Sequence, residues 1–219
     1  MPSSKDAIVA SLITSFETAK HNAAPYPHWF LENCLPQDTI DDIIALPFPA
    51  PELGGISGKR EVHNATRKYF DADNMARHDV CKRFNEAFQD PRVTSAIERI
   101  FSTKLKDTFL RVEFAQDTNG FWLEPHTDLG VKSFTFLLYL SKDPEHANLG
   151  TDIYDNEKRH LGAAPFKSNG ATIFVPSTNT YHGFEPREIK GVRKSLIVNY
   201  VTNEWRAREQ LAYPNTPIA

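Results

Sequence analysis

Apolar residues return every three or four positions through much of the first half of the chain. The spacing is clear over residues 3–20, after a serine of the kind that commonly precedes a helix. It returns in QDTIDDIIAL at 37–46, in NMARHDVCKRFNEAF at 74–88 and in PRVTSAIERIF at 91–101. The last segment begins with a proline, which fits the first turn of a helix. The pattern predicts helix in each of these segments, with one face apolar.

A stretch rich in proline and glycine, residues 47–70, interrupts the helical half. Its sequence, PFPAPELGGISGKREVHNATRKYF, predicts a long loop with a short strand near residues 61–63. Loops of this length are usually functional or disordered. We expect residues 49–69 to form a lid over a site, with Arg60 and Arg67 as candidate contacts to an acidic substrate. Ordinary solvated charge is the alternative reading of these arginines.

The period of the pattern changes to two after residue 106, as it does in β-strands. Within TFLRVEFA, the apolar Leu110, Val112 and Phe114 alternate with polar residues. Further strand-like segments follow between clusters of Gly, Pro, Asn and Asp: SFTFLLYL, TDIYD, ATIFVP and RKSLIVNYV. Several short strands behind a helical half predict a mainly β fold, closed or double-sheeted, with flanking helices packed on its outside.

The composition is that of one globular domain. With 219 residues, of which 40% are hydrophobic, the chain can bury a sizeable core. We expect a single domain over residues 1–219, in which residues 1–105 give mostly helical support and the lid loop, and residues 106–203 form the β core. A net charge of −3 gives no general attraction to nucleic acid or anionic membrane, and no apolar run is long enough to span a bilayer. Small molecules or proteins are the expected partners, and the oligomeric state is open.

Cysteine usage and the first residues bear on the compartment. Cys34 and Cys81 are the two cysteines, too few for a disulfide framework or a thiolate zinc site. The opening MPSSKDAIVASLITSF lacks the long apolar core and small-residue cleavage site of a secretory signal. Both features favour a reducing, cytoplasmic location in which the cysteines are ordinary thiols.

The segment EPHTDLG, residues 124–130, holds the first candidate for metal chemistry. In an extended segment alternate side chains share a face, so His126 and Asp128 could reach one ion. A polar turn after Pro125 is the alternative. His182, at the end of a turn-rich segment, would complete a set of two imidazoles and one carboxylate, which leaves coordination sites of iron(II) open.

A second candidate site lies on the last apolar strand. Arg193 and Ser195 are two positions apart, so they share a face, where a guanidinium and a hydroxyl can hold a carboxylate together. A buried arginine requires an anionic partner, and a bound ligand would provide one. The strand therefore predicts a site for a carboxylate ligand.

Together these residues resemble the motif of 2-oxoglutarate and iron(II) dependent dioxygenases of the prolyl-4-hydroxylase-like branch. The motif is His-X-Asp, a distant His, and a later Arg followed by X-Ser. The chain has these in the same order: His126, Asp128, His182, Arg193 and Ser195. The resemblance runs from LRVEFAQDTNGFWLEPHTD to GVRKSLIVNYV. It implies a double-stranded β-helix, or jelly-roll, core with the N-terminal helices packed on it.

The resemblance also implies the cofactors. The triad would hold iron(II), and Arg193 with Ser195 would hold the far carboxylate of the cosubstrate 2-oxoglutarate. Many relatives also carry a tyrosine at the end of the first core strand that contacts the cosubstrate, and here Phe114 stands in that place. Tyr139, on the inward alternation of the next strand, is the candidate replacement; a packed core tyrosine is the alternative.

The implied reaction is hydroxylation of an unactivated C–H bond, in which 2-oxoglutarate is decarboxylated to succinate and CO2. Desaturation or ring closure would start from the same substrate radical. A small-molecule substrate is favoured over a protein. If the strand alternation is as predicted, further pocket residues face the mouth of the β core: Arg111, Trp122 and Tyr154.

Two other functions are open. One is a cupin-like metal enzyme that does not use 2-oxoglutarate, and the other is a noncatalytic β-barrel binding module. The pair Arg193 and Ser195 argues against the first, because a cupin-like enzyme would not need a carboxylate anchor. The intact triad argues against the second.

Overall fold

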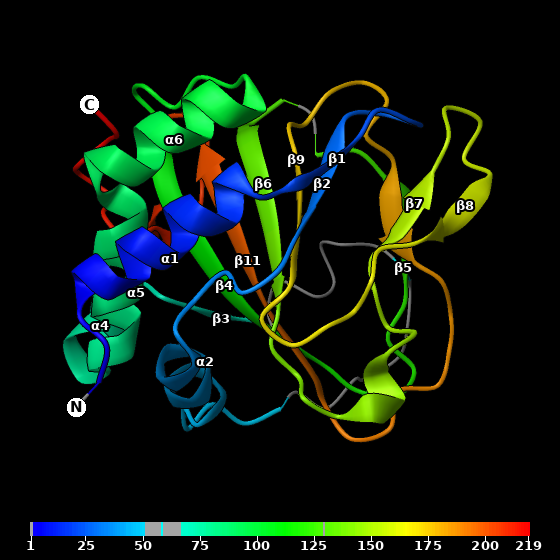
Figure 1. Cartoon of the computed structure of the whole chain (residues 1–219), viewed down its shortest axis with the longest axis horizontal. Coiled ribbons are helices and arrows are strands. Elements are labelled where there is room, and N and C mark those ends of the chain that lie inside the picture. The colour runs from blue at the N-terminus through cyan, green and yellow to red at the C-terminus, as the bar shows by residue number, and fades with distance from the viewer. Residues whose placement is uncertain (1, 51–57, 59–66, 129) are drawn as a thin grey trace.

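The fold is built from three layers (Figure 1). The computed structural model describes residues 2–50, 58, 67–128 and 130–219. A seven-stranded sheet lies in the middle, helices cover one of its faces, and a four-stranded sheet packs against the other. This is the double-sheeted β core with flanking helices that the sequence predicts. Over the described residues the two sheets do not close into a barrel.

Neighbouring strands in both sheets are antiparallel. The large sheet has the order β1-β2-β9-β6-β11-β4-β3, and the small sheet has the order β5-β10-β7-β8. The strands of the large sheet are β1 Lys20–Asn22, β2 His28–Leu31, β3 Lys68–Tyr69, β4 Phe109–Asp117, β6 Lys132–Tyr139, β9 Ala171–Phe174 and β11 Arg193–Val201. The strands of the small sheet are β5 Leu123–His126, β7 Asp152–Tyr154, β8 His160–Ala163 and β10 His182–Phe184.

The helical layer comes from the N-terminal half of the chain. Its described helices are α1 Lys5–Glu17, α2 Gln37–Ile44, α4 Ala72–Arg77, α5 Asp79–Gln89 and α6 Pro91–Phe101. The side-chain oxygens of Ser4 and Asp90 accept backbone N–H groups at the starts of α1 and α6. The helical pattern over 74–88 does not form one continuous helix, because His78 adopts an extended conformation between α4 and α5 (φ −131°, ψ 107°).

The large sheet separates two apolar cores. On the helical side, alternate residues of β4 and β11 pack against the helices and are buried: Leu110, Val112, Phe114, Leu196 and Val198. On the other side, apolar residues of both sheets form a smaller core that includes Leu137, Tyr139, Ile153 and Phe184. The predicted alternation of β4 is confirmed, and it turns Glu113 and Asp117 of that strand toward the small sheet.

Strands from the N-terminal half extend the large sheet at both edges. β2 pairs with β9 and carries β1 on its outer side, while β3 pairs with β4. The pattern of this half predicts neither β1 nor β2. PYPHWFLENCLP, which contains β2, is short and broken by prolines, and β1 is three residues that begin where the predicted first helix ends. β2 forms because β9 presents an edge of unpaired backbone groups, which the four residues His28–Leu31 satisfy.

Most of the predicted lid, the strand predicted at 61–63 and Arg60 lie outside the described residues. Gly58 is described, and its carbonyl oxygen accepts the backbone N–H of Glu124 at 2.9 Å. Its φ is +66°, and a Cβ added to it would lie 2.2 Å from the ring of Trp122. This glycine therefore lies directly against the segment that leads into β5.

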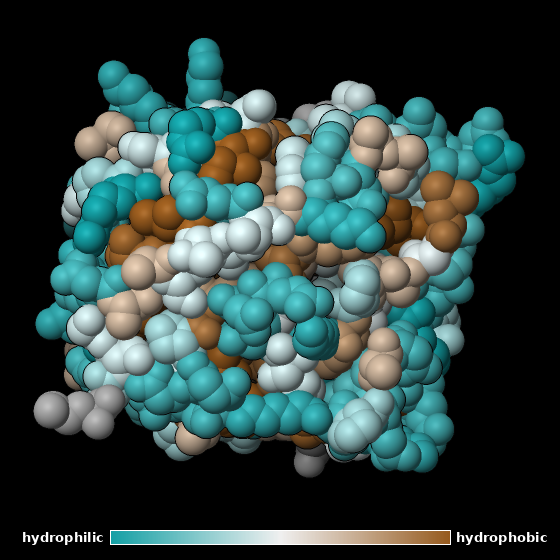
Figure 2. Space-filling model, in the orientation of Figure 1, coloured by the Kyte–Doolittle hydropathy of each residue, from teal (hydrophilic) through white to brown (hydrophobic). Residues whose placement is uncertain are grey.

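Hydrophilic residues cover much of the face seen in Figure 2, with smaller hydrophobic areas between them. Among the described large hydrophobic residues, Leu161 in β8 stands out at 57% exposed. Cys34 and Cys81 are free and buried, as expected for ordinary thiols. None of the described helices combines the length and the apolar character needed to cross a bilayer.

Candidate metal and carboxylate site

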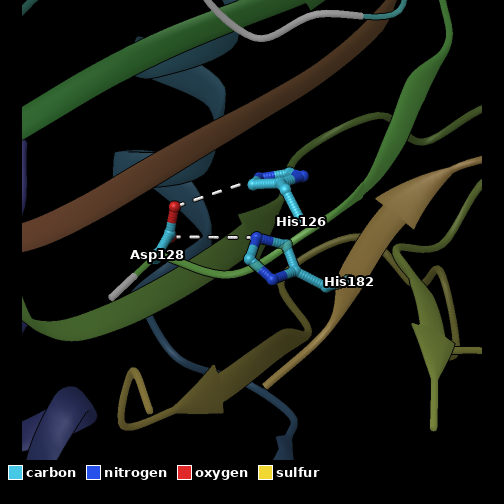
Figure 3. Close-up of side chains that lie close together, drawn as sticks. All are labelled: His126, Asp128 and His182. Atoms are coloured by element: carbon cyan, nitrogen blue, oxygen red, sulfur yellow. Dashed lines mark ion pairs between the residues drawn. The ribbon is translucent and has the colours of Figure 1, made fainter. Parts of the chain in front are cut away.

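The three candidate metal ligands meet where β5 ends and β10 begins. His126 is the last residue of β5 and His182 the first of β10, and the antiparallel pairing sets them opposite each other. Asp128 lies two residues beyond β5. The ligand atoms of the three side chains lie within 4.8 Å of one another, and Figure 3 shows both rings beside the carboxylate. Residues 124–126 of EPHTDLG thus form the end of a short strand that carries the first ligand, and Asp128 follows that strand.

Backbone carbonyl groups orient both imidazoles. The Nδ1 of His126 lies 2.9 Å from the carbonyl oxygen of Glu124, and the Nδ1 of His182 lies 3.0 Å from that of Thr180. A carbonyl oxygen only accepts hydrogen bonds, so Nδ1 carries the proton and Nε2 keeps its lone pair. The two Nε2 atoms are 3.9 and 3.8 Å from carboxylate oxygens of Asp128. This tautomer is the one that a metal ligand requires.

Burial keeps His182 neutral. Desolvation, followed by repulsion from His126, lowers the pKa of His182 to about 3, and attraction by Asp128 offsets this only in part. A neutral imidazole has a lone pair to give to a cation. Two imidazoles and one carboxylate at these separations fit a divalent ion that accepts nitrogen and oxygen ligands, such as iron(II).

Two residues of β6 hold the carboxylate of Asp128, which is 7% exposed. The Nζ of Lys132 lies 2.7 Å from Oδ1, and the hydroxyl of Thr135 donates to Oδ2 at 3.2 Å. Thr135 in turn accepts a hydrogen bond from the Nδ2 of Asn199, on the neighbouring strand β11, at 3.0 Å. The large sheet therefore orients a carboxylate that follows a strand of the small sheet.

A cavity lies between the two sheets beside the metal ligands. His182 and Gly183 line it on the side of the small sheet, and Arg193 and Ser195 line it on the side of the large sheet. The two residues of β11 share a face, as the alternation predicts. Apolar side chains complete much of the wall: Phe121, Leu123, Leu137, Phe184 and Ile197. One space thus joins a metal-binding group to a guanidinium.

The guanidinium of Arg193 is held by groups of the protein itself. Its Nε donates to the carbonyl oxygen of Leu149 at 2.7 Å, and one terminal nitrogen lies 2.5 Å from a carboxylate oxygen of Asp117. Asp117, which is not among the predicted site residues, lies directly opposite Arg193 in the pairing of β4 with β11. The sequence does place Asp117 on the same face of this strand as Arg111 and Glu113, because all three are separated by even numbers of residues.

Tyr139 lines the cavity, as proposed from the alternation of β6. The residue is fully buried, and its hydroxyl lies 3.0 Å from the hydroxyl of Thr151 and 3.1 Å from that of Thr172. A phenol in the wall is placed to contact a ligand in the cavity and is at the same time part of the smaller core. Burial in the smaller core fits the packed-tyrosine alternative, and contact with a cosubstrate stays a prediction.

Phe114 does not stand where a cosubstrate contact would be. Its ring faces the helical layer, with its centroid 5.7 Å from that of Phe48, because it shares an alternation with the buried Val112. The residues of β4 that line the cavity are Glu113, Ala115 and Asp117. Phe114 therefore lies on the face of β4 opposite the cavity, so its ring does not contact a ligand bound there.

The substrate candidates separate into two groups. Arg67 lines the cavity. Arg111 is not among the lining residues: it is fully buried, with its guanidinium carbon 4.8 Å from the ring centroid of Tyr69 and 4.8 Å from that of Trp205. It contacts Glu113 at 2.7 Å, so it belongs to the wall behind the cavity.

Trp122 and Tyr154 also lie outside the cavity lining. Trp122 packs on Gly58, and the ring of Tyr154 lies 5.4 Å from that of His160. Arg187, in the loop after β10, forms an ion pair with Asp152 at 3.0 Å. Alternation alone could not place these residues, because Trp122 lies just before β5 and because alternation does not say which sheet the short strand of Tyr154 joins.

No protein-family model matches the sequence, and no curated protein matches it. Solved structures do match in fold. A prolyl-4-hydroxylase from Pseudomonas putida has a TM-score of 0.57 at 14% identity, over 89% of this chain and 99% of its own. A prolyl hydroxylase from Trichoplax adhaerens, in complex with a hypoxia inducible factor peptide fragment, has a TM-score of 0.58 at 13% identity, over 93% of each chain.

A third similar structure is the non-heme α-ketoglutarate dependent epimerase SnoN from nogalamycin biosynthesis. Its TM-score is 0.54 at 14% identity, over 90% of this chain and 83% of its own. The chain therefore has the fold of the prolyl-4-hydroxylases and of related 2-oxoglutarate and iron(II) oxygenases, which confirms the fold predicted from the sequence. Within this fold it places a His-Asp-His group that suits a metal ion.

Proposed function

We propose that this protein is an iron(II) and 2-oxoglutarate dependent oxygenase that hydroxylates an unactivated C–H bond. The observation that carries the proposal is the meeting of two imidazoles and a carboxylate beside a cavity that also contains Arg193. The two imidazoles and the carboxylate suit a metal ion, and Arg193 suits a carboxylate. The binding of 2-oxoglutarate requires a metal ion and a carboxylate anchor in the same cavity. The fold of the similar oxygenases supports the same assignment.

The proposed roles follow from the contacts. His126 and His182 bind iron(II) through Nε2, and Asp128 binds it through a carboxylate oxygen. Arg193 binds the far carboxylate of 2-oxoglutarate, with Ser195 beside it on the same face. Bound iron(II), with 2-oxoglutarate and O2, supplies the oxidising chemistry that leaves succinate and CO2.

The protein's own share is to orient these groups and to exclude water. Lys132 and Thr135 fix the carboxylate of Asp128. Tyr139 offers its hydroxyl to the cosubstrate from the cavity wall. Apolar side chains such as Leu137 and Ile197 lower the local dielectric, so the contact between Arg193 and a carboxylate is stronger here than in water.

Two features of the site favour this function over the cupin-like enzyme and the noncatalytic module. A cupin-like enzyme without 2-oxoglutarate has no use for Arg193, which is 6% exposed and lines the same cavity as His182. A noncatalytic binding module has no use for two imidazoles whose carbonyl partners turn both Nε2 atoms toward one carboxylate.

We further propose a small-molecule substrate, since the cavity is bounded by side chains of both sheets. The similar structures include a prolyl hydroxylase bound to a peptide and an epimerase of nogalamycin biosynthesis. The assay is therefore run on a metabolite extract and on a peptide library, with succinate release as the readout. Release with the peptides alone would contradict the small-molecule proposal and leave the oxygenase assignment intact.

The triad is tested by His126→Ala and His182→Ala, each of which removes one of three ligands. We expect both variants to lose stoichiometric iron(II), measured by metal analysis after desalting, and to lose succinate release with it. His21→Ala, which removes an exposed histidine, is the matched control. Full iron content in both triad variants would show that the metal, if any, lies elsewhere.

Arg193→Met tests the carboxylate anchor. A charge-assisted contact contributes about 1.5–3 kcal/mol, so we expect the concentration of 2-oxoglutarate needed for half-maximal turnover to rise at least tenfold. The control is Arg159→Met, since the Arg159 side chain is 70% exposed. An unchanged requirement in Arg193→Met would move the anchor to another residue.

A further inference from the structure

A buried carboxylate already occupies the proposed cosubstrate anchor. Asp117 is 1% exposed, and its two oxygens lie 2.5 Å from Arg193 and 2.5 Å from Arg67. All three side chains line the same cavity. The pairing of β4 with β11 sets Asp117 directly opposite Arg193, so the contact is built into the register of the sheet.

This arrangement must affect any carboxylate ligand of Arg193. The Nε of Arg193 is taken by Leu149 and one terminal nitrogen by Asp117, which leaves part of the guanidinium for a ligand. Asp117 also cancels the positive charge that attracts the ligand, and two carboxylates repel each other strongly in a buried site. On electrostatic grounds Asp117 opposes the binding of 2-oxoglutarate.

Arg67 acts on the same carboxylate from the other side. It contacts Asp117 through one terminal nitrogen, its Nε lies 3.4 Å from Glu113, and its guanidinium carbon lies 5.2 Å from the ring centroid of Phe121. Asp117 therefore keeps a cationic partner when a ligand takes over Arg193. Without Arg67, that displacement would leave a buried acid unpaired.

We propose that Asp117 is an internal competitor for Arg193, which sets the affinity of the site for 2-oxoglutarate, and that Arg67 lowers the cost of displacing it. The inference rests on the proposed function, since it takes Arg193 as the anchor. A rival role has Asp117 only orienting Arg193 toward its ligand. The two roles predict opposite changes when the charge of Asp117 is removed.

The experiment measures 2-oxoglutarate binding to the Mn(II)-loaded protein by titration calorimetry, with Mn(II) binding measured first. For Asp117→Asn, which keeps the shape and removes the charge, we expect the Kd for 2-oxoglutarate to fall at least threefold. The Kd for 2-oxopentanoate should stay unchanged, because this ligand has the same chain length and lacks the far carboxylate. Asp79→Asn, in the helical layer, is the charge-matched control, since the Asp79 side chain is 73% exposed.

Arg67→Gln gives a second and independent readout. We expect it to raise the Kd for 2-oxoglutarate at least threefold, because of the two arginines that contact Asp117 among the described residues, Arg193 is then the one left. Adding Asp117→Asn to Arg67→Gln should remove that increase. This pair of variants keeps the inference testable if Asp117→Asn alone proves unstable.

Each of the other outcomes would contradict either the role of Asp117, the proposed cosubstrate or the metal triad. Weaker 2-oxoglutarate binding in Asp117→Asn, or an equal change for 2-oxopentanoate, would assign Asp117 to orienting Arg193 or to general packing, and would leave the proposed function in place. Wild-type protein that binds Mn(II) but no 2-oxoglutarate would overturn both this inference and the proposed cosubstrate. Wild-type protein that binds no metal would overturn the triad as well.

Discussion

A row of hydrogen bonds holds one oxygen of the Asp128 carboxylate, while Lys132 holds the other. Its Oδ2 accepts from Thr135, which accepts from Asn199, whose own Oδ1 lies 3.4 Å from a terminal nitrogen of Arg111. This row crosses β6, β11 and β4 and ends on a fully buried guanidinium. A metal ligand with one oxygen held in this way loses little conformational freedom when the ion binds.

Thr135→Val removes the donor and keeps the shape of the side chain. Loss of an outer contact to a metal ligand typically lowers metal affinity by about 10–100-fold, so we expect a fall of that order in Mn(II) affinity. Thr135→Ser, which keeps the hydroxyl, should bind nearly as the wild type does. Competition titration with a chelator measures both variants. Equal affinity in Thr135→Val and the wild type would show that the Thr135 hydroxyl does not orient Asp128 for the ion.

The close pairing of β10 with β5 brings the two imidazoles together. Gly183, next to His182, makes that approach possible: a Cβ there would lie 2.7 Å from the carbonyl oxygen of Leu123 and 3.2 Å from that of Glu124. Both contacts are with backbone atoms, which cannot rotate away. A side chain at this position must push the strands apart, and His182 would move with β10.

Gly183→Ala should therefore lower both the stability of the fold and the affinity for a metal ion. We expect the free energy of unfolding to fall by about 1–3 kcal/mol, as for other overpacked sites, and Mn(II) affinity to fall at least tenfold. Denaturant unfolding and metal titration provide the two measurements. Leu161→Ala, on an exposed position of β8 in the same sheet, should change neither. Normal metal affinity in Gly183→Ala would show that the ligands adjust independently of the strand.

The metal group links the two sheets of the molecule. His126 and His182 come from the small sheet, while Asp128 is held by Lys132 and Thr135 of the large sheet. An ion bound to all three ligands would therefore resist separation of the sheets. Because the unfolded chain does not hold these groups together, binding must raise the stability of the folded state.

Mn(II) at 100 times its Kd should raise the free energy of unfolding by about 2.7 kcal/mol. Denaturant unfolding with and without the ion measures the change. The His182→Ala variant serves as the control and should show no comparable increase at the same Mn(II) concentration. A similar increase in that variant would mean that the ion stabilises the protein through another site.

Local patterns determined the helices, the main strands and the order of the candidate ligands. The alternation of Leu110, Val112 and Phe114 already marked the buried face of β4, because apolar side chains on one side of a strand must be covered. The face shared by Arg193 and Ser195 follows from the same period of two. The motif order that includes His126 and His182 is likewise a property of the chain alone.

Tertiary structure decided which of these elements meet. β5 and β10 are short and follow turns, so their pairing, and with it the meeting of the triad, comes from contacts across the fold. Asp117 and Arg193 are 76 positions apart, and no local pattern reveals that they face each other. The alternation of side chains along a strand shows which residues share a face. What that face contacts is determined only by how the sheets pack. For this reason the sequence indicated Arg193 as an anchor but not the carboxylate already paired with it.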